Sequence, residues 1–159
     1  MGQEILTTAG ELIGLFLERA VQCDLTPKEA ALNIKAQGGL IYLEHPYDPF
    51  RRRLSEASIE SLADLIDIVE VFNGRSDEQA NRRAEDLCRI LGAAPGAGSD
   101  AHSLREIGSV YVEIEDFHGA QDFLAKLRRA QIVRRRHKLF LFAEATLGNK
   151  LRKQRRVLH

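Results

Sequence analysis

Two short segments bring together side chains of the types that most often hold metal ions. GSDAHS, residues 98–103, places Asp100 and His102 two positions apart among small residues, and LEHPYDP, residues 43–49, carries His45. Carboxylate oxygen and imidazole nitrogen are ligands of zinc, manganese and iron. Taken singly, each segment has a plainer alternative: a capping aspartate beside an incidental histidine, or a histidine hydrogen-bonded at the rim of a loop. Together the two segments favour a metal site.

The positions of these residues along the chain favour the same chemistry. His45, Asn73 and Asp100 each come just after a short apolar run typical of a buried strand, and one strand–helix unit separates each from the next. In α/β folds of the barrel type, the carboxyl ends of the strands converge on one face, where functional sites are built. We therefore expect these three side chains to lie near one another. Asn73 and Arg75 would line the mouth of the site or cap the helix that follows.

Short apolar runs alternate with amphipathic stretches, which predicts parallel β/α units with buried strands. Thr26, Pro27 and Glu29 mark a helix start, because threonine is a good N-cap, proline fits the first turn and glutamate completes a capping box. Glu70 lies among apolar neighbours and is expected to be a buried, paired carboxylate, while Cys88 is expected in the core. The predicted strands cover residues 12–17, 40–43, 68–72 and 109–114, with a short segment at 94–99, and the predicted helices cover residues 26–37, 55–65, 76–91, 120–129 and 138–156.

The composition is that of an ordinary single domain. The chain has 159 residues, of which 44% are hydrophobic and 29% charged, and no apolar run reaches the roughly 20 residues that a membrane-spanning helix needs. Its two cysteines lie far apart, which predicts reduced thiols in a cytoplasmic protein. The sequence contains neither a G-x-x-x-x-G-K-[ST] loop nor a G-x-S-x-G elbow, which argues against nucleotide-driven and serine-hydrolase chemistry.

The net charge is zero, but the charges are unevenly distributed. Twelve of the 23 lysines and arginines fall in residues 126–159, against a single acid, Glu144. An acidic body, residues 1–125, is therefore expected to carry a basic C-terminal extension. The expected division of the chain is a β/α domain at residues 1–137 and a basic C-terminal helix or tail at residues 138–159. This basic segment is either a solvated helix or a surface that contacts phosphate-bearing ligands or nucleic acid.

Several runs of the chain are similar to those of one protein family. The order and spacing of five runs resemble the PHP (polymerase and histidinol phosphatase) superfamily of metal-dependent phosphoesterases: GQEILTTAGELIGLFL, AQGGLIYLEHPYD, DIVEVFNGRS, AGSDAH and EIGSVYVEI. The resemblance covers nearly the whole chain. It implies a distorted seven-stranded β/α barrel in which two or three metal ions activate water for attack on a phosphoester.

The resemblance implies a set of metal ligands in this sequence. Glu4 matches the bridging glutamate of the family's G-x-E segment, His45 matches the histidine of its strand-His-Pro loop, and Asp100 and His102 match its late Asp-x-His pair. Glu11 lies near a position where some members place a further ligand. The implied cofactor is a divalent ion, zinc, manganese or iron, in a number that the resemblance leaves open. Asp100 and His102 are the implied catalytic residues.

The sequence departs from the family at its N-terminus. The family's H-x-H motif, and the histidines and aspartate that follow it, have no match in a chain that starts only three residues before Glu4. We therefore expect an incomplete barrel of about five strands that retains roughly half of the family's ligands. Such an open sheet exposes unpaired strand edges. The expectation is either a truncated chain or a barrel completed by another segment or by an oligomer.

Two functions are compatible with these patterns. The first is a phosphoesterase of the PHP type, impaired by the missing ligands, that acts on a phosphorylated small molecule, a nucleotide or an oligonucleotide. In it, Arg51, Arg52 and Arg53 after the His45 loop would bind the substrate phosphate, unless they form a solvated basic loop. The second is a catalytically inactive remnant that binds partners through its basic C-terminal helix.

Overall fold

The structure, a computed structural model, describes residues 1–134, so the predicted helix at 138–156 and the tail at 138–159 lie outside the described residues. Within the described range no helix is both long and apolar enough to cross a membrane. The elements are, in order, β1 (Gln3–Thr7), β2 (Gly10–Leu15), α1 (Pro27–Lys35), β3 (Leu40–Leu43), α2 (Glu56–Ser61), β4 (Ile68–Asn73), α3 (Glu78–Leu91), β5 (Ala94–Gly98), β6 (Val110–Glu113), α4 (Gly119–Leu127) and β7 (Gln131–Arg134).

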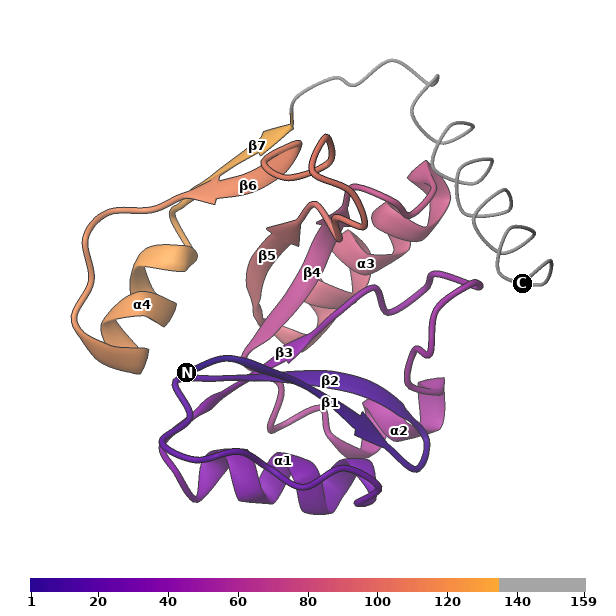
Figure 1. The fold of residues 1–159 in the computed structure, drawn as a ribbon, viewed down its shortest axis with the longest axis vertical. Helices are drawn as coiled ribbons and strands as arrows, with labels where there is room; N and C mark the ends of the chain where they lie inside the picture. Colours follow the sequence, from indigo (N-terminus) through magenta and orange to yellow (C-terminus); the bar gives the residue numbers. More distant parts are fainter. Residues whose placement is uncertain (135–159) are drawn as a thin grey trace, which may run out of the picture.

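A mixed five-stranded sheet organises the molecule, with the strand order β1-β2-β3-β4-β5 (Figure 1). β1, β2 and β3 pair antiparallel, whereas β3, β4 and β5 pair parallel. β6 and β7 form a separate antiparallel ribbon. The α/β class is confirmed, but the expected parallel pairing holds only for β3, β4 and β5 among the described strands. The sheet formed by residues 1–134 is open, so the barrel implied by the resemblance is not confirmed.

The first hairpin corrects the sequence-based prediction. The predicted strand at 12–17 starts earlier, at Gly10, and pairs with a second strand, β1, that the apolar pattern did not indicate. The turn between them, Thr8 and Ala9, lacks the Asn-Gly or Asp-Gly signal by which such hairpins are usually found. Gly10 has a φ of 126°, and a Cβ there would lie 2.7 Å from the carbonyl oxygen of Arg53, so only glycine fits.

Alternation along the strands divides the core between the two faces of the sheet. On one face α1, α2 and α3 cover side chains such as Ile41 and Leu43 of β3. On the other face, Leu40 and Tyr42 of the same strand pack with α4 and β6. Figure 1 shows α4 and the β6–β7 ribbon standing apart from α1 and α2. β7 escaped prediction because its side chains are exposed or only half-buried, which leaves little apolar signal.

Local signals placed most helix ends correctly. The predicted capping box forms at the start of α1, where the Thr26 side chain accepts from the Glu29 backbone N–H and the Glu29 carboxylate accepts from that of Thr26. α3 begins after the N-cap Asp77 and ends at Gly92, which adopts the left-handed conformation. Cys88 is buried on α3, as predicted. These helices fix the parallel strands that carry the site.

Candidate metal centre

The parallel pairing of β3, β4 and β5 brings their carboxyl ends to one edge of the sheet. His45 and Asp100 each stand two residues beyond a strand, and Asn73 is the last residue of β4. The regular spacing of His45, Asn73 and Asp100 along the chain therefore places all three residues at one edge of the sheet, as expected. Both His45, with a φ of 29°, and Asp100, with a φ of 46°, adopt the left-handed backbone region that side chains other than glycine seldom occupy. Such strain is often found at functional positions.

His45 is buried in a form suited to metal binding. Its backbone N–H donates to Glu70 Oε2 at 2.8 Å, which fixes the loop ahead of Pro46. Its ring nitrogen Nδ1 is buried without a hydrogen-bond partner, and Nε2 lies 3.4 Å from Glu44 Oε2. Burial is the main cause of the lowered pKa of His45, and it favours the neutral imidazole that coordinates metals.

Glu44 is a candidate site residue that the sequence-based prediction missed. It is only 5% exposed, and its Oε1 has no hydrogen-bond partner. Burial, and then repulsion from Glu4, Glu70, Glu11 and Asp100, raises the pKa of Glu44 to about 9. The available signal was its position, since a carboxylate directly continues the buried run of β3 and precedes His45. A buried acid with an unused oxygen is the kind of group that a cation stabilises.

The β1–β2 hairpin contributes two more carboxylates. Glu4 pairs with Ile13 and Leu6 with Glu11 across the hairpin, so Glu4 and Glu11 are diagonal neighbours on the same face. Burial is the first cause of the raised pKa of Glu11, and the second is the charge of Glu4. Asp100 acts on Glu11 in the same direction. We call Glu4, Glu11, Glu44 and Asp100, together with His45, the acidic cluster.

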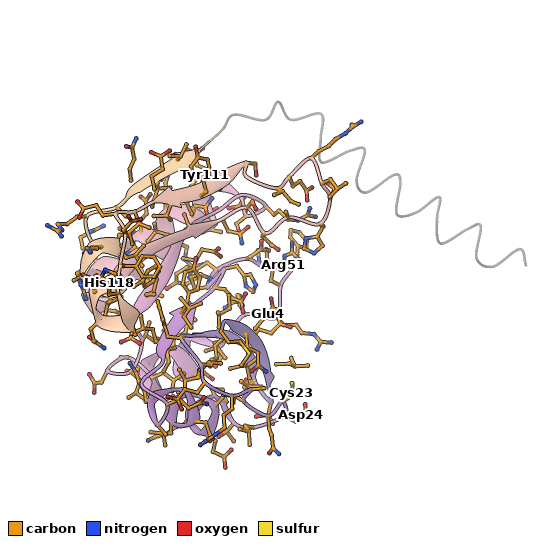
Figure 2. All side chains as sticks on the ribbon, turned by 60° about the vertical axis from the view of Figure 1, so that its left-hand side comes forward. Glu4, Cys23, Asp24, Arg51, Tyr111 and His118 are labelled. Atoms are coloured by element: carbon orange, nitrogen blue, oxygen red, sulfur yellow. The ribbon has the colours of Figure 1, made fainter. Side chains whose placement is uncertain are left out.

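The loop after β5 carries Asp100 and His102 beside a basic side chain. The Asp100 side chain is 20% exposed and that of His102 is 47% exposed. Arg51 Nη2 lies 2.8 Å from Asp100 Oδ2, and Arg51 Nη1 lies 3.3 Å from His102 Nε2. Arg52 and Arg53 are exposed in the same loop. Figure 2 shows Arg51 and Glu4 on the same side of the molecule, away from Tyr111 and His118.

The two other predicted substrate-binding residues make structural contacts. The Asn73 side chain accepts from the backbone N–H groups of Arg75 and Ser76, so it caps the turn before α3. The Arg75 guanidinium forms an ion pair with Glu106 at 2.9 Å. The helix α3 itself is capped by Asp77, not by Asn73. Substrate binding by Asn73 and Arg75 stays a prediction.

Glu70 behaves as the sequence predicted, as a buried and paired carboxylate. Its Oε2 accepts from the backbone of His45 and from Asn73 Nδ2, and its Oε1 accepts from the Tyr42 hydroxyl at 3.3 Å. Burial raises the pKa of Glu70 to about 6, while these hydrogen bonds act to lower it. Glu70 therefore positions the loop of His45 from behind.

The side chains of this region are of the types that bind a divalent cation, but their donor atoms are not gathered around one point. In the part of the chain that the structure describes, no three His, Cys, Asp or Glu side chains are grouped as a metal site. The acidic cluster nevertheless supplies oxygen and nitrogen donors of the right types. Glu44 Oε1 and His45 Nδ1 are buried without partners, and the repulsion among the carboxylates would be relieved by a positive ion.

Comparisons with known proteins point to one superfamily. Residues 78–132 match the family model PHP_C, described as PHP-associated. The chain is 37% identical over 123 residues to an uncharacterized protein of Methanocaldococcus jannaschii, an alignment that covers 74% of this chain and 52% of that protein. The chain thus spans about half the length of this relative.

Two crystal structures have a similar fold. PsfC from Pseudomonas syringae matches with a TM-score of 0.65 and 17% identity over 96% of this chain and 65% of its own. A two-domain protein from Bacteroides vulgatus, described as containing a predicted PHP-like metal-dependent phosphoesterase, matches with a TM-score of 0.62 and 20% identity over 84% of this chain and 44% of its own. At these identities the likeness establishes the fold alone. The relationship to the PHP superfamily is indicated by the matched family segment, residues 78–132.

Proposed function

We propose that this chain forms part of a PHP-type, metal-dependent phosphoesterase and that its acidic cluster binds a divalent metal ion. The observation that carries the proposal is the burial of Glu44 and His45, with unpartnered donor atoms, among carboxylates that repel one another. Removing charged groups from water is costly unless an opposite charge compensates them. Zinc, manganese and iron are the ions that this mixture of oxygen and nitrogen donors suits.

The proposed metal ligands come from the two strand-end loops and the first hairpin. Glu4, Glu11, His45, Asp100 and His102 would hold the ion, with Glu44 as an added ligand. A bound divalent ion lowers the pKa of water and polarises a phosphoryl oxygen. Further ligands would come from outside the described residues.

Substrate recognition would fall to the basic loop after β3. Arg52 and Arg53 are exposed there, close in sequence to Arg51, which already contacts the site. Arginine side chains bind phosphate oxygens through paired N–H groups. We propose a phosphorylated small molecule, a nucleotide or an oligonucleotide as the substrate class.

A second candidate function is a binding module without catalysis. The observation that favours it is the absence, within residues 1–134, of three donor side chains grouped as a metal site. In that case the basic segment beyond residue 134 would bind an anionic partner. Such binding would weaken as salt concentration rises.

Metal content tests the first proposal directly. Untagged full-length chain, purified without chelator and dialysed against Mn²⁺ or Zn²⁺, should retain about one equivalent or more of metal. The variant Asp100→Ala/His102→Ala should lose it, whereas His118→Ala, a surface histidine at the start of α4, should retain it. Hydrolysis of p-nitrophenyl phosphate and of bis(p-nitrophenyl) phosphate should follow metal content.

Other outcomes would separate the two functions. A chain that binds no metal even with excess ion would overturn the phosphoesterase proposal. Salt-sensitive binding of an oligonucleotide by that same protein, with no hydrolysis under any ion, would support the binding module.

A further inference from the structure

The guanidinium of Arg51 lies where two of the predicted metal ligands meet. Its Nη2 is 2.8 Å from Asp100 Oδ2 and its Nη1 is 3.3 Å from His102 Nε2. Arg51 belongs to the loop after β3, whereas Asp100 and His102 belong to the loop after β5. The contact therefore closes the two loops over the edge of the sheet.

The partners show which lone pairs face the guanidinium. His102 Nδ1 lies 2.8 Å from the backbone carbonyl oxygen of Asp100, so Nδ1 carries the proton that it donates there. Nε2 then has its lone pair free to accept from Arg51, which can only donate. The same lone pair would coordinate a metal. Asp100 Oδ2 forms an ion pair with Arg51 without an aligned hydrogen bond, so it keeps unused acceptor capacity.

Both loops are held in place by contacts of their own. Glu106 accepts from the backbone N–H groups of His102 and Ser103, at 2.5 and 3.1 Å, which anchors the loop after β5. Asp48 accepts from the backbone of Phe50 and from the Ser76 hydroxyl, both at 2.8 Å, which anchors the loop after β3. The positions of Asp100 and His102, the two side chains that Arg51 contacts, are thus fixed by contacts that do not involve Arg51.

We propose that Arg51 is an internal cation at this position and that a divalent ion must displace it in order to bind Asp100 and His102. The inference rests on the proposed function, because it concerns the same ligands. Two positive charges cannot share these donors without strong repulsion. Since the Arg51 and Asp100 side chains are 23% and 20% exposed, solvent weakens their ion pair and displacement stays within reach of a metal ion.

The consequence is that Arg51 lowers the affinity of the site for metal. Replacing it with a neutral residue should tighten binding, by about tenfold on the usual scale of such couplings. Arg51→Lys keeps the charge but cannot contact both partners through a planar fork, so its affinity should fall between those of the wild type and the neutral variant. A divalent ion that enters the site would also release the guanidinium.

The test is the dissociation constant for Mn²⁺ or Zn²⁺, measured by titration calorimetry on the full chain. The variants are Arg51→Gln, Arg51→Lys and, as the matched control, Arg82→Gln. Arg82 forms a 2.6 Å ion pair with Glu78 on the exposed face of α3, so its loss removes the same charge from the surface. We expect tighter binding in Arg51→Gln, a smaller change in Arg51→Lys and none in Arg82→Gln.

Each remaining outcome decides a separate question. Equal affinity of the wild type and Arg51→Gln would overturn the inference and leave the metal site standing. Equal tightening in Arg82→Gln would assign the effect to net charge and would also overturn it. Absence of binding in every variant would overturn the proposed function and this inference with it. If Arg51→Gln does not fold, Arg51→Lys still decides, because wild-type affinity in it would contradict the fork contact.

Discussion

Two polar regions adjoin at the carboxyl edge of the parallel strands, and they differ in how their buried groups are paired. In the first, around Glu70 and Asn73, the buried polar atoms hydrogen-bond to one another. In the second, Glu44 Oε1 and His45 Nδ1 have no hydrogen-bond partner, and nearby carboxylates repel one another. A paired network stabilises the fold, whereas buried polar atoms without hydrogen-bond partners destabilise it until a ligand compensates them. The contrast separates residues that support the loops from residues whose buried polar atoms are unpaired, and it is the second group that we propose to bind a cation.

The largest expected effect is a pH dependence that Glu44 imposes on the metal-free protein. Its pKa is raised from 4.5 to about 9, first by burial and then by neighbouring carboxylates. The folded state therefore holds a proton that the unfolded state releases. The free energy of unfolding should fall as the pH rises from about 5 to about 9, by up to about 1.4 kcal/mol per pH unit. Urea denaturation in the presence of chelator should show that Glu44→Gln removes this part of the slope.

The control for this prediction must separate Glu44 from its histidine neighbour. The pKa of His45 is lowered, chiefly by burial, so its contribution to stability is lost as the pH falls below 6.5. The difference between wild type and Glu44→Gln therefore isolates the glutamate. Glu60→Gln makes the same chemical change on the exposed part of α2, outside the acidic cluster. Parallel pH profiles for the wild type and Glu44→Gln would contradict the prediction.

Asn73→Ala should break the paired region at its centre. The side chain donates to Glu70 Oε2 at 3.0 Å and accepts from the backbone of Arg75 and Ser76 at 2.8 and 3.2 Å. Truncation removes one of the hydrogen bonds of Glu70 Oε2 and leaves the N–H groups of Arg75 and Ser76 without their side-chain acceptor in a partly buried place, which should cost about 3 kcal/mol in the free energy of unfolding. Urea denaturation at neutral pH measures the loss.

Asn33→Ala is the matched control for the same side chain. The Asn33 side chain donates one exposed hydrogen bond, to the Glu29 carbonyl oxygen on α1, so its loss should change stability by no more than about 0.5 kcal/mol. If the two variants lost equal stability, the network around Asn73 would not be the structural support that its hydrogen bonds indicate.

Sequence reasoning located the paired region and part of the unpaired one because both follow buried strands. The apolar runs of β3, β4 and β5 predicted that His45, Asn73 and Asp100 lie at the same edge of the sheet. The parallel pairing of these strands places them there. Glu44 was not predicted as a site residue because the neighbouring His45 matches the strand-His-Pro loop of the family, whereas the glutamate does not match a motif of the family. That His45 and Asp100 bind metal stays a prediction.

Other features could not be read from the sequence because they depend on tertiary contacts. Gly10 is required by the backbone of Arg53, which is distant in sequence, and this crowding is invisible until the chain is folded. The contact of Arg51 with Asp100 and His102 likewise joins two loops that only the sheet brings together. A basic loop in a sequence suggests a phosphate-binding site, but which acidic side chains it contacts depends on how the strands are arranged in the fold.

Gly98→Ala should have the smallest effect on the free energy of unfolding. It tests the contact between the paired region around Glu70 and the unpaired region around His45. A Cβ at position 98 would lie 2.8 Å from Glu70 Oε1, closer than real Cβ atoms approach. Glu70 can move away only by weakening its bonds to Tyr42 and to the backbone of His45. Such overpacking should cost about 1 to 2 kcal/mol in the free energy of unfolding, measured in urea.

Gly2→Ala is the control, because a Cβ there meets its nearest atom, in the Leu15 side chain, at an ordinary 3.4 Å. No loss in Gly98→Ala would mean that the Glu70 carboxylate moves freely. Its hydrogen bonds would then be too weak to hold His45 in its left-handed backbone conformation. A loss limited to Gly98→Ala would mean that Glu70 is rigid, so the strain at His45 is maintained by the paired region behind it.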